Sequence, residues 1–293
     1  MEPSLTSGVE QVKEAVGSLR LRRPHYRPML DYYEKVMVAQ ETVKAAMSRI
    51  SLPPDPFLLV DEVAEVTGAP TENTLINFAA GPARDLLATI CQACRANGLH
   101  SPAMVERLEQ AAADGGSTFD LFLRDFLLRD RDAIDRYTAV HGLDRGFLMH
   151  VVYNSLRPGL QIWSQNVATM QPEGVGMACG TCPVCSEAPA LAILDDEGAR
   201  MLNCHFCWHQ WRVTRGCCPL CNTRDPDLLG YFYSEEEPEY RVELCESCRT
   251  YLKQVDSREA GRPLYPPLEH IVTLHLDLAI QKEGYTSSSD VPF

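Results

Sequence analysis

Residues 200–221 read RMLNCHFCWHQWRVTRGCCPLC and contain two CxxC pairs, CHFC and CPLC. A third pair, CPVC, precedes this segment, and a fourth, CESC, follows it. Two residues between cysteines let a tight turn direct both sulfurs at one ion, and two such turns complete a tetrahedral four-sulfur site. In chain order the pairs are Cys182/Cys185, Cys204/Cys207, Cys218/Cys221 and Cys245/Cys248.

The spacing of the pairs indicates which of them share a site. Cys185 and Cys204 are separated by 18 residues, and Cys221 and Cys245 by 23. The first gap lies within the usual range for a CxxC…CxxC metal site, and the second is slightly longer. We therefore expect one site from the first two pairs and another from the last two, so residues 200–221 contain the junction of two tandem modules.

The sequence between the pairs favours short strands. The runs LAIL (191–194), WRVT (211–214) and YFYS (231–234) are β-prone, and residues 195–198 are typical of a turn. Turns of the CxxC type occur both in zinc ribbons and in rubredoxin-type iron sites. Since four thiolates in a tetrahedron suit either metal, the ligand set predicts two metal ions, one per site, and leaves iron or zinc open.

The charge of the chain limits its partners. Its 293 residues include 40 acidic and 27 basic side chains, which give a net charge of −13. Two divalent four-thiolate sites would take this to about −17. A protein that binds nucleic acid without regard to sequence needs cations to displace phosphate counterions, so this class is disfavoured.

The sequence also predicts the compartment. No apolar run reaches the roughly 18 residues of a membrane span. The N-terminal residues MEPSLTSGVEQVKEAV lack the basic start and apolar stretch of a signal peptide. We expect a cytoplasmic protein, in which 12 cysteines favour metal or redox roles over structural disulfides.

Ten of the 12 cysteines lie between Cys179 and Cys248, and the preceding part of the chain reads as helical. Helical patterns there cover residues 26–50, 81–98, 117–128 and 144–163, with Pro82 near the start of the second and Pro158 as a kink or break in the fourth. They predict an irregular helical bundle.

The predicted fold is α-helical with a small β component. We expect a helical N-terminal domain, two tandem rubredoxin-like or zinc-ribbon modules, and a C-terminal helix that packs back on the core. A helical apolar stripe over residues 267–285 supports the last element. The predicted boundaries are residues 1–170 for the helical domain, 171–215 and 216–262 for the two metal modules, and 263–293 for the C-terminal helix.

Four cysteines lie outside the predicted sites. Cys91 and Cys94 form a fifth CxxC, but their spacing places both on one face of a helix, which favours core packing over a redox pair or an extra metal site. Cys179 and Cys217 each precede a CxxC turn, where packing at the module edge is favoured over a reactive thiol.

Other polar residues near the sites are less specific. His205 and His209 flank the second pair, but four cysteines already fill each site, so neither is expected to be a ligand. Arg212, Arg215 and Arg224 either offset the thiolate charge or belong to a solvated face. We find no Ser-His-Asp arrangement, glycine-rich phosphate loop or catalytic carboxylate pair in the sequence, so we do not expect an enzyme.

Three segments carry a family resemblance: CPVCSEAPALA (182–192), GARMLNCHFCWHQWRVTRGCCPLC (198–221) and YRVELCESCRTYLKQVDSRE (240–259). The order of the four pairs, the Trp and Arg residues between the second and third, and C-x-x-C-x-x-Y-L-K after the last resemble the formate dehydrogenase accessory protein family, FdhE. The resemblance covers most of residues 175–286. The N-terminal part resembles that family mainly in its helical character.

The resemblance implies a cytoplasmic factor that is needed for an active respiratory formate dehydrogenase. It implies binding to the catalytic molybdenum- or tungsten-containing subunit, with the eight paired cysteines as ligands and iron as a serious candidate. Cys91, Cys94, Cys179 and Cys217 match no ligand position of the family. The alternative is a rubredoxin-like iron redox carrier that acts on a client enzyme, and a zinc-ribbon nucleic-acid module is disfavoured by the acidic charge.

Overall fold

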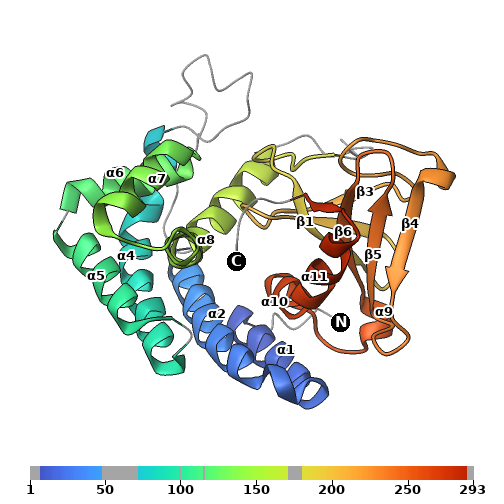
Figure 1. The fold of residues 1–293 in the computed structure, drawn as a ribbon, viewed down its shortest axis with the longest axis horizontal. Helices are drawn as coiled ribbons and strands as arrows, with labels where there is room; N and C mark the ends of the chain where they lie inside the picture. The colour runs from blue at the N-terminus through green and yellow to red at the C-terminus, as the bar shows by residue number, and fades with distance from the viewer. Residues whose placement is uncertain (1–6, 48–71, 99, 115, 171–179, 289–293) are drawn as a thin grey trace. The chain divides into compact units, whose positions relative to one another are not determined.

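The chain folds into two compact units in a computed structural model, which describes residues 7–47, 72–98, 100–114, 116–170 and 180–288 (Figure 1). Most of the first unit is Arg23–Trp163, and most of the second is Ser164–Val291. The first is helical, and the second contains a sheet with the cysteine pairs and the C-terminal helices. This confirms the predicted fold class, while the predicted domain boundaries stay a prediction.

The first unit is a bundle of helices. Its elements are α1 (Gly8–Arg22), η1 (Pro24–Tyr26), α2 (Arg27–Met47), α4 (Glu72–Asn97), α5 (Pro102–Asp114), α6 (Gly116–Leu127), α7 (Arg131–His141) and α8 (Arg145–Met170), of which α1 and α8 also contribute residues to the second unit. α4 packs against α2, α5 and α6. Phe122 on α6 stacks on Tyr137 of α7, with ring centroids 3.9 Å apart. Aromatic contacts of this kind contribute beyond the apolar area that they bury.

The two longest helices both contain a proline. The sequence pattern places Pro82 near the first turn, but α4 begins at Glu72 and Pro82 lies inside it, so that prediction is wrong. α8 likewise continues through Pro158 and does not break there. A proline removes one backbone hydrogen bond, and a helix of 26 residues retains the others. Within the described part of the chain, none of the helices combines the length and apolar character needed to cross a bilayer.

The core of the first unit contains Cys91 and Cys94. The hydroxyl of Tyr32 lies 2.7 Å from His150 Nε2 and 3.4 Å from Cys94 Sγ, and all three side chains are buried. Cys91 is also fully buried, and burial raises the pKa of its thiol to about 12. Both cysteines are therefore core residues, as their shared helix face predicts.

The second unit is built on one mixed sheet of seven strands. Its elements are β1 (Pro189–Leu194), β2 (Arg200–Cys204), β3 (Gln210–Val213), η2 (Pro226–Leu228), β4 (Leu229–Tyr233), β5 (Tyr240–Cys245), β6 (Thr250–Asp256), α9 (Ser257–Ala260), α10 (Pro266–Val272), α11 (Leu274–Lys282) and β7 (Thr286–Ser287). The strand order is β3-β2-β1-β6-β5-β4, with β7 beside β6. The three β-prone runs lie mainly in β1, β3 and β4, which confirms them as strands.

The two predicted modules repeat one order of elements within this sheet. A CxxC turn precedes β1 and another joins β2 to β3, and in the same way one precedes β4 and one joins β5 to β6. β1 and β6 pair in parallel, with Leu191 opposite Lys253, and this pairing joins the two repeats. Every residue of β1 is buried. In two separate modules β1 would be an edge strand with exposed residues. Pairing with β6 buries it, which favours one continuous sheet.

The C-terminal segment packs on the sheet as two helices. The apolar stripe predicts one helix, but Thr273 separates α10 from α11. Thr273 Oγ1 donates to the carbonyl of Glu269 at 2.7 Å, and such side-chain bonds compete with helical ones. Lys253 on β6 donates to the carbonyl of His270 at 2.9 Å and pairs with Asp277. This buried lysine therefore holds both helices against the sheet.

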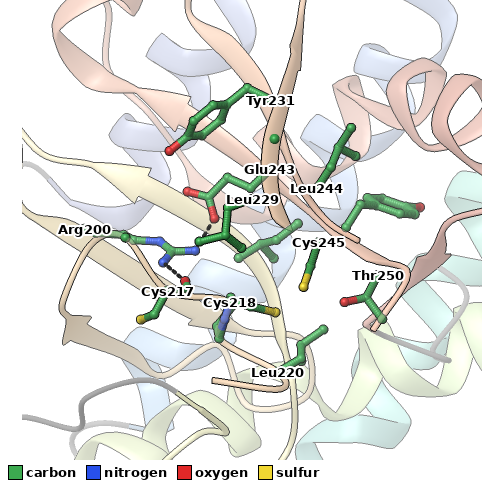
Figure 2. A pocket seen from close by; sticks show the side chains of 15 residues that line it. Arg200, Cys217, Cys218, Leu220, Leu229, Tyr231, Glu243, Leu244, Cys245 and Thr250 are labelled. Atoms are coloured by element: carbon green, nitrogen blue, oxygen red, sulfur yellow. Dashed lines mark hydrogen bonds and ion pairs between the residues drawn. The ribbon is translucent and has the colours of Figure 1, made fainter. Parts of the chain in front are cut away.

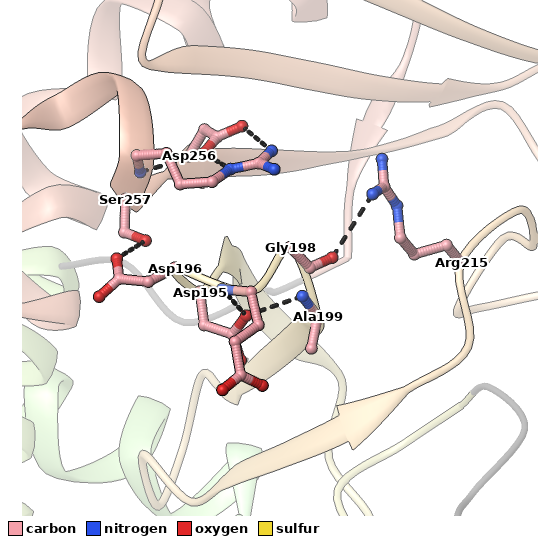
Figure 3. Close-up of polar contacts among 9 residues, drawn as sticks. Asp195, Asp196, Gly198, Ala199, Arg215, Asp256 and Ser257 are labelled. Carbon is pink, nitrogen blue, oxygen red and sulfur yellow. Dashed lines mark hydrogen bonds and ion pairs between the residues drawn. The ribbon is translucent and has the colours of Figure 1, made fainter.

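The turn between β1 and β2 contacts the segment after β6 (Figure 3). Asp195 Oδ1 accepts hydrogen bonds from two N–H groups of its own turn, at 3.0 and 2.7 Å, which confirms the predicted turn. Ser257 donates to Asp196 Oδ1 at 2.8 Å, and Arg215 donates to the carbonyl of Gly198 at 3.4 Å. These contacts hold parts of both repeats together.

Candidate metal centres

All four CxxC turns share one backbone geometry. The residue directly after the second cysteine has a positive φ, between 56° and 61°. In the first turn Cys182 N donates to the carbonyl of Glu187 at 2.7 Å, and in the third Cys218 N donates to that of Thr223 at 2.9 Å. Sequence reasoning missed these left-handed positions, because none is a glycine and only one is an asparagine, which adopts this conformation readily. They are Ser186, Trp208, Asn222 and Arg249.

The first group brings together Cys182, Cys185, Cys204 and Cys207, as the spacing predicts. Cys185 Sγ lies 3.4 Å from Cys204 Sγ and 3.5 Å from Cys207 Sγ, and Cys182 Sγ lies 3.7 Å from Cys207 Sγ. All four side chains are buried. Backbone N–H groups within the two turns lie 3.4 Å from Cys182 Sγ and 3.3 Å from Cys204 Sγ. Such donors stabilise thiolates and orient them.

The second group brings together Cys218, Cys221, Cys245 and Cys248, again as predicted. The sulfurs of Cys218 and Cys248 are 3.7 Å apart, and those of Cys221 and Cys245 are 3.6 Å apart. Cys221 is exposed and Cys248 is half-buried, unlike any cysteine of the first group. The Thr250 hydroxyl lies 2.9 Å from Cys248 Sγ. The two groups thus share their internal geometry and differ in access to solvent.

Both groups suit a four-coordinate metal ion. Within each group the four sulfurs lie within 4.8 Å of one another. A tetrahedral ion with metal–sulfur bonds of about 2.3 Å requires sulfurs about 3.8 Å apart, close to the distances above. The eight cysteines therefore form two clusters able to hold a metal ion, and the sulfur-only donor set accepts zinc and iron alike.

The thiols in each group differ in how readily they ionise. In the first group, hydrogen bonds from the other three thiols hold the pKa of Cys185 far below its ordinary value, whereas burial raises that of Cys204. In the second, burial raises the pKa of Cys218 to about 12. At the exposed Cys221, a small desolvation cost is outweighed by hydrogen bonds from Thr223 and neighbouring thiols, which lower its pKa to about 6. In each group, burial thus opposes ionisation of the thiols, whereas hydrogen bonds from neighbouring groups favour one thiolate.

A small cavity of about 30 Å³ beside the second group contains an ion pair that the sequence did not reveal. Cys218 and Cys245 of that group line the cavity. In Figure 2, Arg200 of β2 points at Glu243 of β5 and donates to the carbonyl of Cys217 at 3.0 Å. Burial raises the pKa of Glu243, and the charge of Arg200 opposes that shift. This ion pair joins residues 43 positions apart and so links the two repeats.

The remaining candidates lie outside the clusters. Among the described residues, the two groups contain cysteines only. His205 Nδ1 lies 2.9 Å from a backbone carbonyl, and the His209 ring is parallel to Trp211 with centroids 6.2 Å apart. Cys217 is buried, belongs to neither cluster and is disulfide-bonded, so the sequence-based preference against disulfides does not hold at this position. Cys179 lies outside the described residues.

Curated relatives match part of this chain. A protein described as "Protein FdhE homolog" from Aquifex aeolicus is 36% identical over 108 residues, which cover 36% of this chain and 38% of that protein. One of the same description from Actinobacillus pleuropneumoniae serotype 3 is 29% identical over 199 residues, which cover 65% of this chain and 58% of that protein. The chain thus spans less than two thirds of the length of each of these relatives. No family model matches the chain.

A solved structure is similar along the whole chain. It is the crystal structure of the FdhE protein from Pseudomonas aeruginosa, with a TM-score of 0.63 and 21% sequence identity. The match covers 100% of this chain and 98% of that one. At this identity the likeness shows a shared fold, which includes the helical region and the sheet with its C-terminal helices.

Proposed function

We propose that this chain, which belongs to the FdhE family as its motifs predicted, is an accessory protein of a respiratory formate dehydrogenase. It would bind the catalytic subunit of that enzyme and be needed for its activity, with no turnover of its own. The observation that carries the proposal is the occurrence of two four-cysteine clusters in one sheet, in a chain whose curated relatives are described as FdhE homologues.

We propose the eight paired cysteines as ligands of two metal ions, iron or zinc, with one ion per cluster. The sulfur spacing in both clusters and the N–H donors aimed at Cys182 Sγ and Cys204 Sγ of the first support this assignment. A divalent ion would reduce the charge of four thiolates from about −4 to about −2 and would contribute its binding energy to folding. The ligands would be Cys182, Cys185, Cys204 and Cys207 in the first site and Cys218, Cys221, Cys245 and Cys248 in the second.

We propose a cytoplasmic location, which rests on the sequence alone. Cysteines arranged in CxxC pairs favour metal binding over structural disulfides, and thiols stay available for a metal in a reducing compartment.

The second candidate function is a rubredoxin-like iron redox carrier that acts on a client enzyme. It is favoured by the exposure of Cys221 and the partial exposure of Cys248, because electron exchange with a partner requires metal ligands near the surface. The first cluster, whose four cysteines are buried, offers no such access.

Capture of the catalytic subunit tests the main proposal. The chain, purified without oxygen, would be immobilised and mixed with a separately produced formate dehydrogenase catalytic subunit, with an unrelated oxidoreductase as the control. We expect the chain to capture the formate dehydrogenase subunit and not the control oxidoreductase. We also expect cells that lack this chain to lose formate dehydrogenase activity. The proposal would be contradicted if the subunit did not bind this chain and if formate dehydrogenase stayed active in cells that lack it.

Metal analysis with a visible spectrum separates the two candidates. About two irons per chain, with a colour that reductant bleaches reversibly, would favour the redox carrier. About two zincs per chain and no visible colour would exclude it and leave the clusters as a scaffold for the client.

A further inference from the structure

The strand β4 is an edge that lacks the usual protection. In the described part of the sheet, β4 is the last strand of the order and pairs with β5 alone. Its five residues, Leu229–Tyr233, include no charge and no proline, the two features that proteins commonly use to block an open edge. The opposite edge, β3, carries the exposed charge of Arg212. Figure 1 shows β4 at the outer side of the sheet.

Three consecutive aromatic side chains on β4 are exposed. Tyr231 is 60% exposed, Phe232 40% and Tyr233 64%. Residues of a strand alternate between the two faces of the sheet, so these rings offer apolar contact on both faces of the same edge. A partner that covered only one face would leave at least one ring in water, whereas an added strand would contact all three.

The backbone of β4 is oriented to accept another strand. Glu246 N donates to the carbonyl of Leu228 at 2.9 Å, which begins the ladder between β5 and β4. Antiparallel pairs alternate between bonded and non-bonded positions, so Gly230 and Phe232 are bonded to β5. The N–H and C=O groups of Tyr231 and Tyr233 therefore point toward the open edge.

Charges at both ends of β4 indicate what the added strand carries. Asp225 and Asp227 precede the strand, Glu235 and Glu236 follow it, and all four are exposed. The exposed cations near this strand include Arg224, Arg241 and Arg215, whose charge acts on Glu243 opposite Tyr231, and the four acidic groups still outnumber these three. The whole chain is also acidic, with a net charge of −13. A basic segment is therefore attracted to this edge, and its arginines or lysines can also lie over the tyrosine rings.

We propose that β4 is the docking edge for an extended, basic segment of a partner protein, which adds to the sheet as a further strand. The segment would alternate β-branched or aromatic residues with arginine or lysine. This inference goes beyond the proposed function, because it concerns the surface and the chemistry of the bound segment whichever protein supplies it.

The test uses two labelled ten-residue peptides and a pair of variants at one position. One peptide alternates threonine and arginine, and the other alternates threonine and glutamate. Tyr233→Thr and Tyr233→Pro both remove the phenol ring, but only proline also removes the N–H that points toward the open edge. We expect fluorescence anisotropy to show saturable binding of the arginine peptide alone, and at least about tenfold weaker binding to Tyr233→Pro than to Tyr233→Thr. Unchanged melting temperature and metal content would establish that the variants are folded.

Hydrogen exchange on the wild-type protein provides a measurement that needs no variant. We expect the arginine peptide to protect the amides of Tyr231 and Tyr233. Replacement of Glu235 and Glu236 by glutamine should weaken binding several-fold and reduce its dependence on salt. The proposal would be overturned if the arginine peptide bound both Tyr233 variants equally or if both peptides bound the wild-type protein equally. It would also be overturned if the wild-type protein were a dimer that the Tyr233→Pro substitution dissociates.

The outcomes also separate this inference from the proposed function. Edge-dependent binding of the arginine peptide by a chain that captures no formate dehydrogenase subunit would support β4 as a docking edge and contradict the proposed function. Equal capture of the subunit by wild-type protein and Tyr233→Pro, without peptide binding, would overturn the docking edge alone.

Discussion

The two four-cysteine clusters have the same motif and different surroundings. The sulfurs are similarly spaced in both, at 3.4–3.7 Å for the closest pairs. All cysteines of the first cluster are buried, whereas Cys221 of the second is exposed. The CxxC turn thus sets the arrangement of sulfurs, and the surrounding elements set their access to water. We infer that a metal in the first cluster mainly stabilises the fold and that one in the second is open to exchange or electron transfer.

The first cluster is enclosed by elements from outside its own repeat. Ser164, in the last turns of α8, donates to the carbonyl of Cys207 at 3.4 Å. The Trp208 ring, next to Cys207, lies edge-on to His270 of α10, with centroids 6.3 Å apart. Burial excludes water and competing ligands, so a ligand lost from this cluster cannot be replaced by solvent without repacking.

The largest expected difference between the clusters is in stability. Cys204→Ser should lose the metal of the first cluster and destabilise the protein by roughly 4 kcal/mol or more, because it also leaves three buried thiols without an ion. Cys221→Ser should cost about 2 kcal/mol, since water can reach the vacated position. Denaturant unfolding with metal analysis measures both. Equal losses of stability would remove the distinction between a structural and an accessible site.

The ion pair of Arg200 with Glu243 joins the two repeats that contain the clusters. Arg200→Met leaves the half-buried Glu243 without its nearest cation and should destabilise the protein by about 2 kcal/mol. Arg212→Met, on the exposed side of β3, is the matched control and should change stability by less than about 0.5 kcal/mol. Thermal melting monitored at both clusters would show a joint loss if the repeats unfold together. If the two arginine variants melt alike, the ion pair does not couple the repeats.

Metal release should be biphasic. With a chelator in excess, the ion of the second cluster should leave at least about tenfold faster than that of the first, because the chelator reaches Cys221 and Cys248 directly. Stopped-flow absorbance of the chelator complex measures both phases. In Cys221→Ser the fast phase should be absent. A single phase in the wild-type protein would mean that exposure does not control exchange.

The smallest expected effect concerns the left-handed residues after the CxxC pairs. Ser186→Gly, in the first cluster, should stabilise the protein by about 0.5–1 kcal/mol, because serine pays a steric cost at its φ of 61°. Asn222→Gly, in the second, should be within about 0.3 kcal/mol of neutral, because asparagine tolerates this conformation. The midpoints of denaturant unfolding measure the change in stability for each of the two variants. A larger gain at Asn222 than at Ser186 would show that the strain lies elsewhere in the turns.

Close spacing along the chain predicts chemistry best in this protein. Two residues between cysteines constrain the backbone strongly, so the sequence groups the eight cysteines correctly without any long-range contact. The apolar face predicts the helix that contains Cys91 and Cys94, but the sequence pattern places its start wrongly at Pro82, inside α4. A single proline is a local signal, and the packing of a long helix overrides it.

Short-range periodicity predicts the number, order and membership of the two clusters and the helical character of the N-terminal part. Only the folded chain determined the parallel pairing of β1 with β6, the ion pair of Arg200 with Glu243, the break at Thr273 and the unequal exposure of the clusters. These features join residues that are far apart in the chain or depend on what packs over them. The two clusters have the same local motif, so their unequal burial depends on elements from elsewhere in the chain that pack over them.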